Sequence, residues 1–167
     1  SKGIAPNTTG NNGPADQPCA FASRVSDGSR KFRFTNTDIF ITNNNGGTSF
    51  ASAQFANTVR WFDNNGWTNT VISLDTTQAT DAECVRAWVN GVSIPLIFGT
   101  PGWNGEDLSI FTQGNTMNLF GGWGNNNPGS GFNQVVGYHT EFRIVDGQAL
   151  TQEAYGVFNN EGIWSPR

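Results

Sequence analysis

The stretch from Asn69 to Ile94, NTVISLDTTQATDAECVRAWVNGVSI, constrains the fold of this chain more than any other. It contains an alternating strand that ends at Asp75, a polar loop to about Glu83, and a second alternating strand. Asn90-Gly91 follows, a dipeptide that supplies positive φ at both centres of a type I′ hairpin turn. The pattern therefore predicts a meander of three antiparallel strands.

The second strand of this meander predicts which side chains face the core. Successive side chains of a strand point to opposite faces, so Val85, Ala87 and Val89 share one face, and we expect it to be the core face. Arg86 and Trp88 then point to the outer side of the sheet. Tryptophan beside arginine is a common combination for sugar stacking or for a protein–protein hot spot.

The rest of the chain shows the same β character. No window of helical length carries apolar residues at three- and four-residue spacing, except the short Thr151–Phe158. Short runs bounded by Gly, Asn, Asp or Pro predict further strands at residues 30–35, 38–42, 57–63, 84–98, 108–111, 117–123 and 138–147. Such a density of short strands favours an all-β sandwich.

Length and local composition predict one domain with a polar N-terminal arm. The chain has 167 residues, enough to bury a core within a single domain but too few for two. Residues 1–18 form a polar N-terminal arm of Pro, Gly, Asn and Thr that has too little apolar surface to order itself. We expect residues 19–167 to form the single domain and the arm to serve as an attachment strap in an assembly.

Charge and hydropathy exclude two classes of partner. Thirteen acidic and nine basic residues give a net charge of −4, and no run of Lys or Arg occurs. The electrostatic footprint for nucleic acid or for an anionic membrane is therefore missing. The longest apolar stretches, such as Ser93–Gly99, fall far short of the roughly 20 residues that span a bilayer. We expect neither nucleic acid nor membrane as a partner.

Metal ligands and cofactor motifs are also scarce. Cys19, Cys84 and His139 are too few for a zinc site, and the two cysteines are either bonded to each other or free and buried. Asp63–Gly66, DNNG, has the atoms that calcium binds, but ordinary turns use the same residues. No calcium motif of fixed spacing occurs, so we expect no metal and no cofactor.

The C-terminal half resembles a known family. A strand ending in SLDTTQ, a strand VRAWVNGV, a glycine-rich strand, EFRIVDGQALT and a closing GIWSPR resemble the concanavalin A-like lectin/glucanase domains of the laminin-G-like type. The likeness covers about residues 57–167. DGQALTQEAYGVFNNEGIWSPR is most similar to domains in virion proteins of tailed bacteriophages. The resemblance implies a jelly-roll β-sandwich with one short C-terminal helix.

In such a sandwich the last 27 residues would close one end. Thr140–Asp146 would be a strand, Asp146-Gly147 would turn the chain, and Thr151 would cap a short helix with Glu153 in its first turn. Trp164 would fold the tail back onto the body and cover a sheet end or edge. The packing residues of this closure would be Ala149, Leu150, Tyr155 and Phe158.

An enzymatic role is not expected. Glucanases of this fold need two carboxylates beside the scissile bond, supplied by Glu, Asp and Glu at alternating strand positions. The carboxylates here are scattered, and Glu106 and Asp107 are adjacent, so their side chains would point apart on a strand. His139 has no partnering nucleophile in sequence reach. We therefore expect no catalytic residues.

Two function classes stay open. The resemblance implies a virion location and a non-enzymatic structural role, decorating a capsid or joining a head or tail fibre through contacts with other virion proteins in an oligomeric assembly. The alternative is an adhesin that binds a host surface glycan. Its candidate binding residues are Arg86, Trp88, Trp103 and Trp123, the last two in loops rich in Gly and Asn. The short chain favours the first role, because phage adhesins usually carry long trimerising shafts.

Overall fold

A computed structural model describes residues 19–24, 30–35, 38–43, 49–55, 67–99, 102–105, 116–119 and 140–167, with side chains in 51–55, 67–99, 102–105 and 140–167. Its elements are β1 (Cys19–Arg24), β2 (Arg30–Thr35), β3 (Asp38–Asn43), β4 (Ser49–Phe55), β5 (Thr70–Leu74), α1 (Asp81–Cys84), β6 (Val85–Val89), β7 (Val92–Ile94), β8 (Leu96–Phe98), β9 (Thr116–Leu119), η3 (Gln152–Ala154), β10 (Gly156–Phe158) and β11 (Trp164–Pro166). These residues form antiparallel strands with little helix, which confirms the all-β class.

The largest sheet in the described residues has six strands in the order β8-β4-β3-β2-β1-β9. β1, β2, β3 and β4 follow one another in the sequence and pair as antiparallel neighbours, as short connections allow. β9 pairs with β1 at one edge of the sheet, and β8 pairs with β4 at the other. The predicted strands at 30–35 and 38–42 are therefore confirmed as β2 and β3. β1 and β4, whose sequences CAFASR and SFASAQF are rich in small residues, were not predicted.

The predicted meander is confirmed as the three-stranded sheet β5-β6-β7. Asn90 and Gly91 have φ of 49° and 77°, as the turn between β6 and β7 requires. The loop between β5 and β6 differs from the prediction because it contains one helical turn, α1. Asp81 and Glu83 lie in that turn, and Cys84 is buried there.

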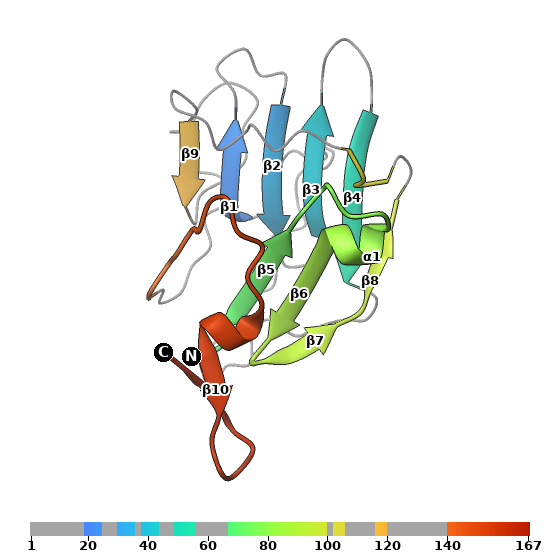
Figure 1. Ribbon diagram of the computed structural model, residues 1–167. Coiled ribbons are helices and arrows are strands. Elements are labelled where there is room, and N and C mark those ends of the chain that lie inside the picture. Colours follow the sequence, from blue (N-terminus) through green and yellow to red (C-terminus); the bar gives the residue numbers. More distant parts are fainter. Residues whose placement is uncertain are drawn as a thin grey trace, which may run out of the picture.

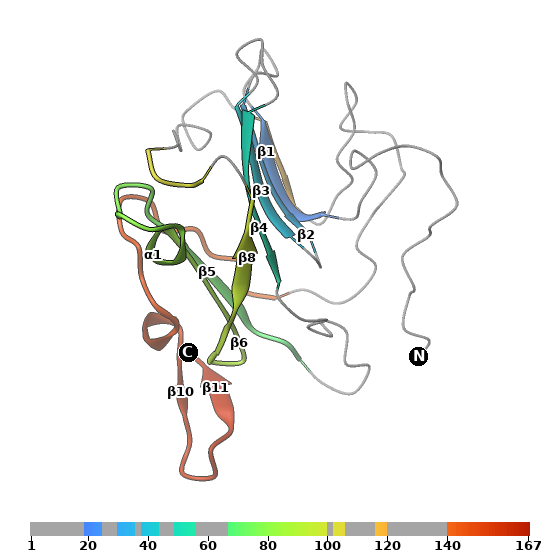
Figure 2. The same cartoon turned by 90° about the vertical axis from the view of Figure 1, so that its right-hand side faces the viewer.

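One continuous segment links the two sheets. β7 pairs with β6 in the three-stranded sheet, whereas β8 pairs with β4 in the six-stranded sheet. Pro95 stands between them and cannot donate a ladder hydrogen bond to either sheet. Figure 2 shows the three-stranded sheet lying on one side of the six-stranded sheet, with its strands crossing the larger sheet obliquely.

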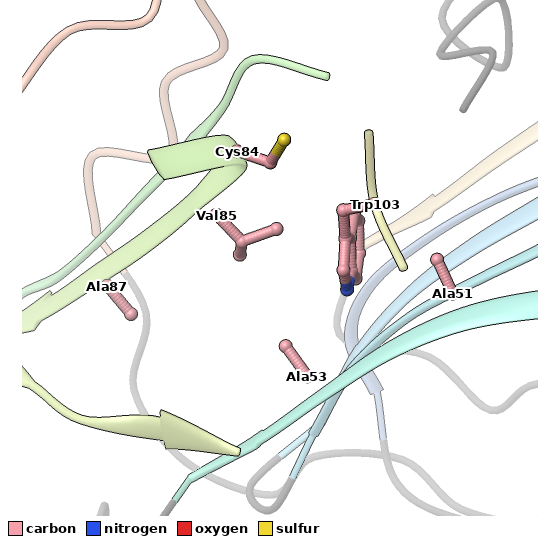
Figure 3. Close-up of a cluster of buried hydrophobic side chains, with 6 residues drawn as sticks. All are labelled: Ala51, Ala53, Cys84, Val85, Ala87 and Trp103. Atoms are coloured by element: carbon pink, nitrogen blue, oxygen red, sulfur yellow. The ribbon is translucent and has the colours of Figure 1, made fainter. Parts of the chain in front are cut away.

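A buried cluster fills the space between the sheets (Figure 3). Ala51 and Ala53 of β4 face Val85 and Ala87 of β6, with exposed fractions of 0–1%. Cys84 and Trp103 complete the cluster, and half-buried side chains pack around it: Phe55, Ile72, Leu74, Leu96 and Phe98. Val85 and Ala87 were predicted for the core face, and that prediction is confirmed. Val89 lies at the end of β6 and is only half-buried.

The C-terminal segment, Thr140–Arg167, departs from the prediction at its start. Thr140–Val145 is not part of a strand, and Glu141 adopts a φ of 53°, which breaks an extended run. The predicted turn at Asp146-Gly147 is confirmed, with φ of 76° at Gly147. The predicted helix is one 3₁₀ turn, η3, in which Glu153 lies in the first turn and Thr151 makes no side-chain cap bond.

The end of the segment forms a small hairpin, β10–β11, in which Phe158 pairs with Trp164. The other predicted packing residues, Ala149, Leu150 and Tyr155, are half-buried. Figures 1 and 2 together show the segment running along the side of the meander that faces away from the six-stranded sheet. Among the residues that the structure describes, no helix has the length and apolar character needed to cross a membrane.

Candidate functional site

Arg86 and Trp88 lie on the outer face of β6, as their spacing predicted, but Trp88 is not an exposed ring. Its exposed fraction is 7%, and its cross-strand neighbours are Val71 and Ser93. The Arg86 guanidinium carbon lies 5.7 Å from the Trp88 ring centroid, within the range of a cation–π contact. The expectation of an accessible platform at Trp88 is therefore wrong, because the outer face of the meander is covered.

Trp103 is buried as well, with an exposed fraction of 0%. Its backbone N–H donates to Asp81 Oδ1 at 2.6 Å, and Gly105 N–H donates to the Thr76 carbonyl at 2.8 Å. These bonds fix residues 102–105 to the β5–β6 loop, so the indole is inserted between the sheets (Figure 3). The prediction that Trp103 presents its ring to a sugar is wrong, since a buried ring in the core has no open face.

The β5–β6 loop is organised around Asp75. Its carboxylate accepts hydrogen bonds from the Thr77 hydroxyl at 2.6 Å, the Gln78 amide at 2.6 Å and the Thr77 backbone N–H at 3.1 Å. These donors lower the pKa of Asp75 below its ordinary value, with a smaller contribution from the positive charge of Arg86. Asp75 thus acts as the anchor of a surface loop.

Cys84 is a free thiol buried at the end of α1. Of the two alternatives for the cysteines, the bond between Cys19 and Cys84 is therefore not formed. Burial raises the pKa of the Cys84 thiol, and the negative charges of Asp81 and Asp75 raise it further. The group is consequently a protonated core side chain and a weak nucleophile at neutral pH.

The meander end, defined by Asn69, Asn90 and Gly91, is where the C-terminal hairpin attaches. Asn69 and Asn90 exchange two hydrogen bonds, from Asn90 N to Asn69 O and from Asn69 N to Asn90 Oδ1, both at 2.8 Å. The Trp164 indole N–H donates to Asn69 Oδ1 at 3.1 Å, and its ring lies against Gly91. The prediction that Trp164 folds the tail back onto a sheet end is confirmed.

Beside the meander end, Trp67 is 69% exposed. No other large apolar side chain in the described residues is as exposed. Trp67, Asn69 and Asn90 were not among the residues predicted to bind a ligand. The available signal was the position of the two asparagines, which bracket the hairpin from the residue before β5 to the residue after β6.

Six other exposed apolar side chains belong to the C-terminal segment. We call this set the C-terminal apolar surface. Its members have exposed fractions between 38% and 59%: Phe142, Ile144, Val145, Val157, Phe158 and Ile163. The Phe158 ring meets Trp164 edge to face, with centroids 5.1 Å apart, so part of this surface is held rigidly.

Several predicted features lie outside the described residues: the arm at 1–18, Asp63–Gly66, Glu106-Asp107, Trp123 and His139. In the part of the chain that is described, no three His, Cys, Asp or Glu side chains come together as metal ligands. The predicted strands at 57–63 and 108–111 also lie outside it.

Comparison with models of protein families, with curated proteins and with solved structures finds no match for this chain.

Proposed function

We propose that this chain is a concanavalin A-like jelly-roll β-sandwich that serves as a non-enzymatic surface protein of a bacteriophage virion. In this role it decorates the capsid or joins a head or tail fibre, within an oligomeric assembly, through contacts with other virion proteins. The proposal rests on the resemblance of Asp146–Arg167 to such domains. The observation that carries it is the C-terminal apolar surface.

That surface supports protein contact because of where it lies. Of the large apolar side chains exposed in the described residues, most belong to the C-terminal segment. Contiguous exposed apolar groups mark protein interaction sites, and three of the six side chains, Val157, Phe158 and Ile163, belong to the single small hairpin β10–β11 and its loop. It is also the segment whose sequence carries the resemblance to virion proteins.

The burial of two tryptophans favours this role over a glycan adhesin that binds through the predicted residues. Trp88 and Trp103 were two of its four candidate residues, and both rings are covered. Several carboxylates are likewise engaged in local structure: Asp75 holds its own loop, Asp81 holds Trp103, and Glu83 accepts from the Thr80 hydroxyl. These contacts give the carboxylates structural roles, which fits a protein without catalytic groups.

The arrangement of the sheets supports the proposed fold. Two antiparallel sheets share one buried cluster, and the chain passes from one to the other at Pro95. A sandwich needs this kind of face-to-face packing of two apolar sheet faces.

The proposal is tested by incorporation into particles of the phage that encodes the chain. Ile163→Asp places a charge in the C-terminal apolar surface, and Val92→Asp is the matched control, because Val92 on β7 is about equally exposed, at 57% against 59%. We expect mass spectrometry to detect the wild-type protein and Val92→Asp in purified particles. We expect Ile163→Asp to be strongly depleted from them. Absence of the wild-type protein from purified particles would contradict the virion role.

A further inference from the structure

We propose that Asn90-Gly91 is a self-modifying site, at which Asn90 loses its side-chain nitrogen as ammonia and becomes aspartate or isoaspartate, and that Trp164 controls access to it. This activity is separate from the protein-contact role and needs no partner. It changes the turn against which the C-terminal hairpin is held.

The reaction joins two atoms of one dipeptide, which keeps the reacting groups close together at all times. The backbone nitrogen of Gly91 attacks Cγ of Asn90, so that an N–Cγ bond forms and the Cγ–Nδ2 bond breaks. The proton of the Gly91 N–H leaves with Nδ2 as ammonia. Water then opens the cyclic imide: attack at Cγ gives aspartate, and attack at the backbone carbonyl carbon gives isoaspartate. Glycine favours the first step, because it has no Cβ to hinder the close approach of its nitrogen.

The side chain of Asn90 is held in a way that favours this attack. Its Oδ1 accepts a hydrogen bond from the Asn69 backbone N–H at 2.8 Å. Negative charge develops on Oδ1 when Cγ is attacked, and an N–H donor already aimed at that oxygen stabilises the charge. Asn90 is exposed, and its Nδ2 has no hydrogen-bond partner within the described part of the chain. The leaving group is therefore free to depart.

The attacking nitrogen is free of hydrogen bonds but is covered. In the described residues the Gly91 N–H donates to no acceptor, so no bond has to break before it reacts. Gly91 is nevertheless buried, and the Trp164 ring lies so close that an added Cβ would collide with it. A bond from Trp164 Nε1 to Asn69 Oδ1, at 3.1 Å, holds the indole in place. Because a base must reach the Gly91 N–H, the seated indole slows the reaction and its release allows it.

A second Asn-Gly pair, Asn104-Gly105, provides a comparison within the same chain. Both residues are exposed. The Gly105 N–H donates to the Thr76 carbonyl at 2.8 Å, and Asn104 Nδ2 donates to the Gln78 carbonyl. The attacking nitrogen and the leaving group are both engaged, so two hydrogen bonds must break first. We therefore expect the fold to protect Asn104 by hydrogen bonding, whereas it protects Asn90 only while Trp164 is seated.

The products change the joint between the meander and the hairpin. Aspartate adds a negative charge to the turn. Isoaspartate also lengthens the backbone, because the chain then runs through Cβ and Cγ of residue 90. Gly91 is displaced from its place against the Trp164 ring, so the hairpin cannot return to its original seat. A transient release of the hairpin is thereby made permanent.

The rate of modification at each asparagine tests the proposal. The full-length protein is incubated in mildly alkaline buffer, and mass spectrometry of its peptides follows Asn90 and Asn104. Trp164→Ala uncovers Gly91, and Ile163→Ala is the matched control, because Ile163 is the exposed neighbour of Trp164. We expect Asn90 to react roughly tenfold faster in Trp164→Ala than in wild type or Ile163→Ala. Asn104 should react slowly and equally in all three, and both asparagines should react at similar rates in guanidinium chloride.

A second variant and a second measurement cover the case in which Trp164→Ala does not fold. Trp164→Phe keeps a ring beside Gly91 but loses the bond to Asn69, so its rate at Asn90 should fall between those of wild type and Trp164→Ala. In wild-type protein modified at Asn90, the Trp164 indole N–H resonance should move from its original position, because the hairpin is no longer seated.

Equal rates at Asn90 in wild type and both Trp164 variants would overturn the proposal. Faster modification of Asn104 than of Asn90 in folded Trp164→Ala, or an unmoved Trp164 resonance in the modified protein, would also overturn it. The virion role would survive any of these results, since it depends on particle incorporation.

Discussion

Two tryptophans attach later segments of the chain to the same meander, and they do so by different means. Trp103 is fully buried between the sheets, and its indole N–H has no hydrogen-bond partner among the residues that the structure describes. Trp164 is only half-buried, and its indole N–H is bonded to Asn69 while its ring lies over two glycines, Gly91 and Gly156. The attachment at Trp103 depends on the amount of apolar surface removed from water. The attachment at Trp164 depends on the close contact of its ring with the two glycines.

This difference has consequences for how each joint responds to change. A core joint loses stability in proportion to the volume deleted, because the surrounding side chains relax only partly. The attachment at Trp164 depends on close contact, so a single methyl group added beneath the ring should lower the free energy of unfolding. Removal of the whole Trp164 ring should lower it less than removal of Trp103. The two regions can therefore be distinguished by the sign and size of matched substitutions.

The largest effect is expected for Trp103→Ala. Removing a fully buried indole should lower the free energy of unfolding by about 3–5 kcal/mol, since it leaves a large cavity beside Ala51 and Ala53. Trp67→Ala is the control and should change it by less than about 0.5 kcal/mol, because Trp67 is mostly in solvent. Urea unfolding measures both, and equal losses would show that Trp103 is not a core residue.

A smaller effect is expected for Gly91→Ala. Gly91 has a φ of 77°, and an added Cβ would collide with the Trp164 ring, so backbone strain and a steric clash combine. Gly147→Ala is a close control, because Gly147 has a φ of 76° and open space around its Cα. We expect Gly91→Ala to cost about 1–3 kcal/mol and to exceed Gly147→Ala.

The cause of that excess can be checked by a double-mutant cycle. In a Trp164→Ala background the collision is gone, so Gly91→Ala should cost no more than Gly147→Ala does in the wild type. An excess that persists without the indole would mean that Trp164 does not pack on Gly91.

The smallest effect on stability is expected in the β5–β6 loop, which is organised around Asp75 and bonded to Trp103. The pKa of Asp75 is lowered in the folded state, so its contribution to stability is present in full above the ordinary value of 3.8 and is lost as the pH falls through the folded value. Asp75→Asn should remove this pH dependence. Urea midpoints at neutral pH and at pH about 3 should diverge less in the variant than in wild type. A parallel loss in both proteins would exclude Asp75 as a contributor.

Local patterns predicted the meander well because its information is local. Alternation sets the faces of β6, and Asn90-Gly91 dictates the turn, so both follow from a few adjacent residues. The same holds for the turn at Gly147. The predicted strand at Thr140–Asp146 is not formed, because alternation shows only that a segment can pair, and pairing needs an available neighbour.

The exposure of a side chain was harder to predict than the face of the sheet to which it points. The outer position of Trp88 followed from alternation, but alternation does not show that only 7% of this residue is exposed. Trp103 sits in a Gly- and Asn-rich stretch that suggests a surface loop, yet the bond from its N–H to Asp81 draws it inward. Long-range contacts of this kind leave no periodic signal in the sequence.

Amide hydrogen exchange on purified particles tests most directly the proposed contact between the C-terminal apolar surface and another virion protein. Exchange in peptides from Val157–Ile163 should be slower in the particle than in the free protein, because a partner excludes water from that surface. Peptides covering Val92–Ile94, which lie on the exposed β7 and outside this surface, should exchange equally in both states. Unchanged exchange across Val157–Ile163 in a particle that contains the protein would contradict the claim.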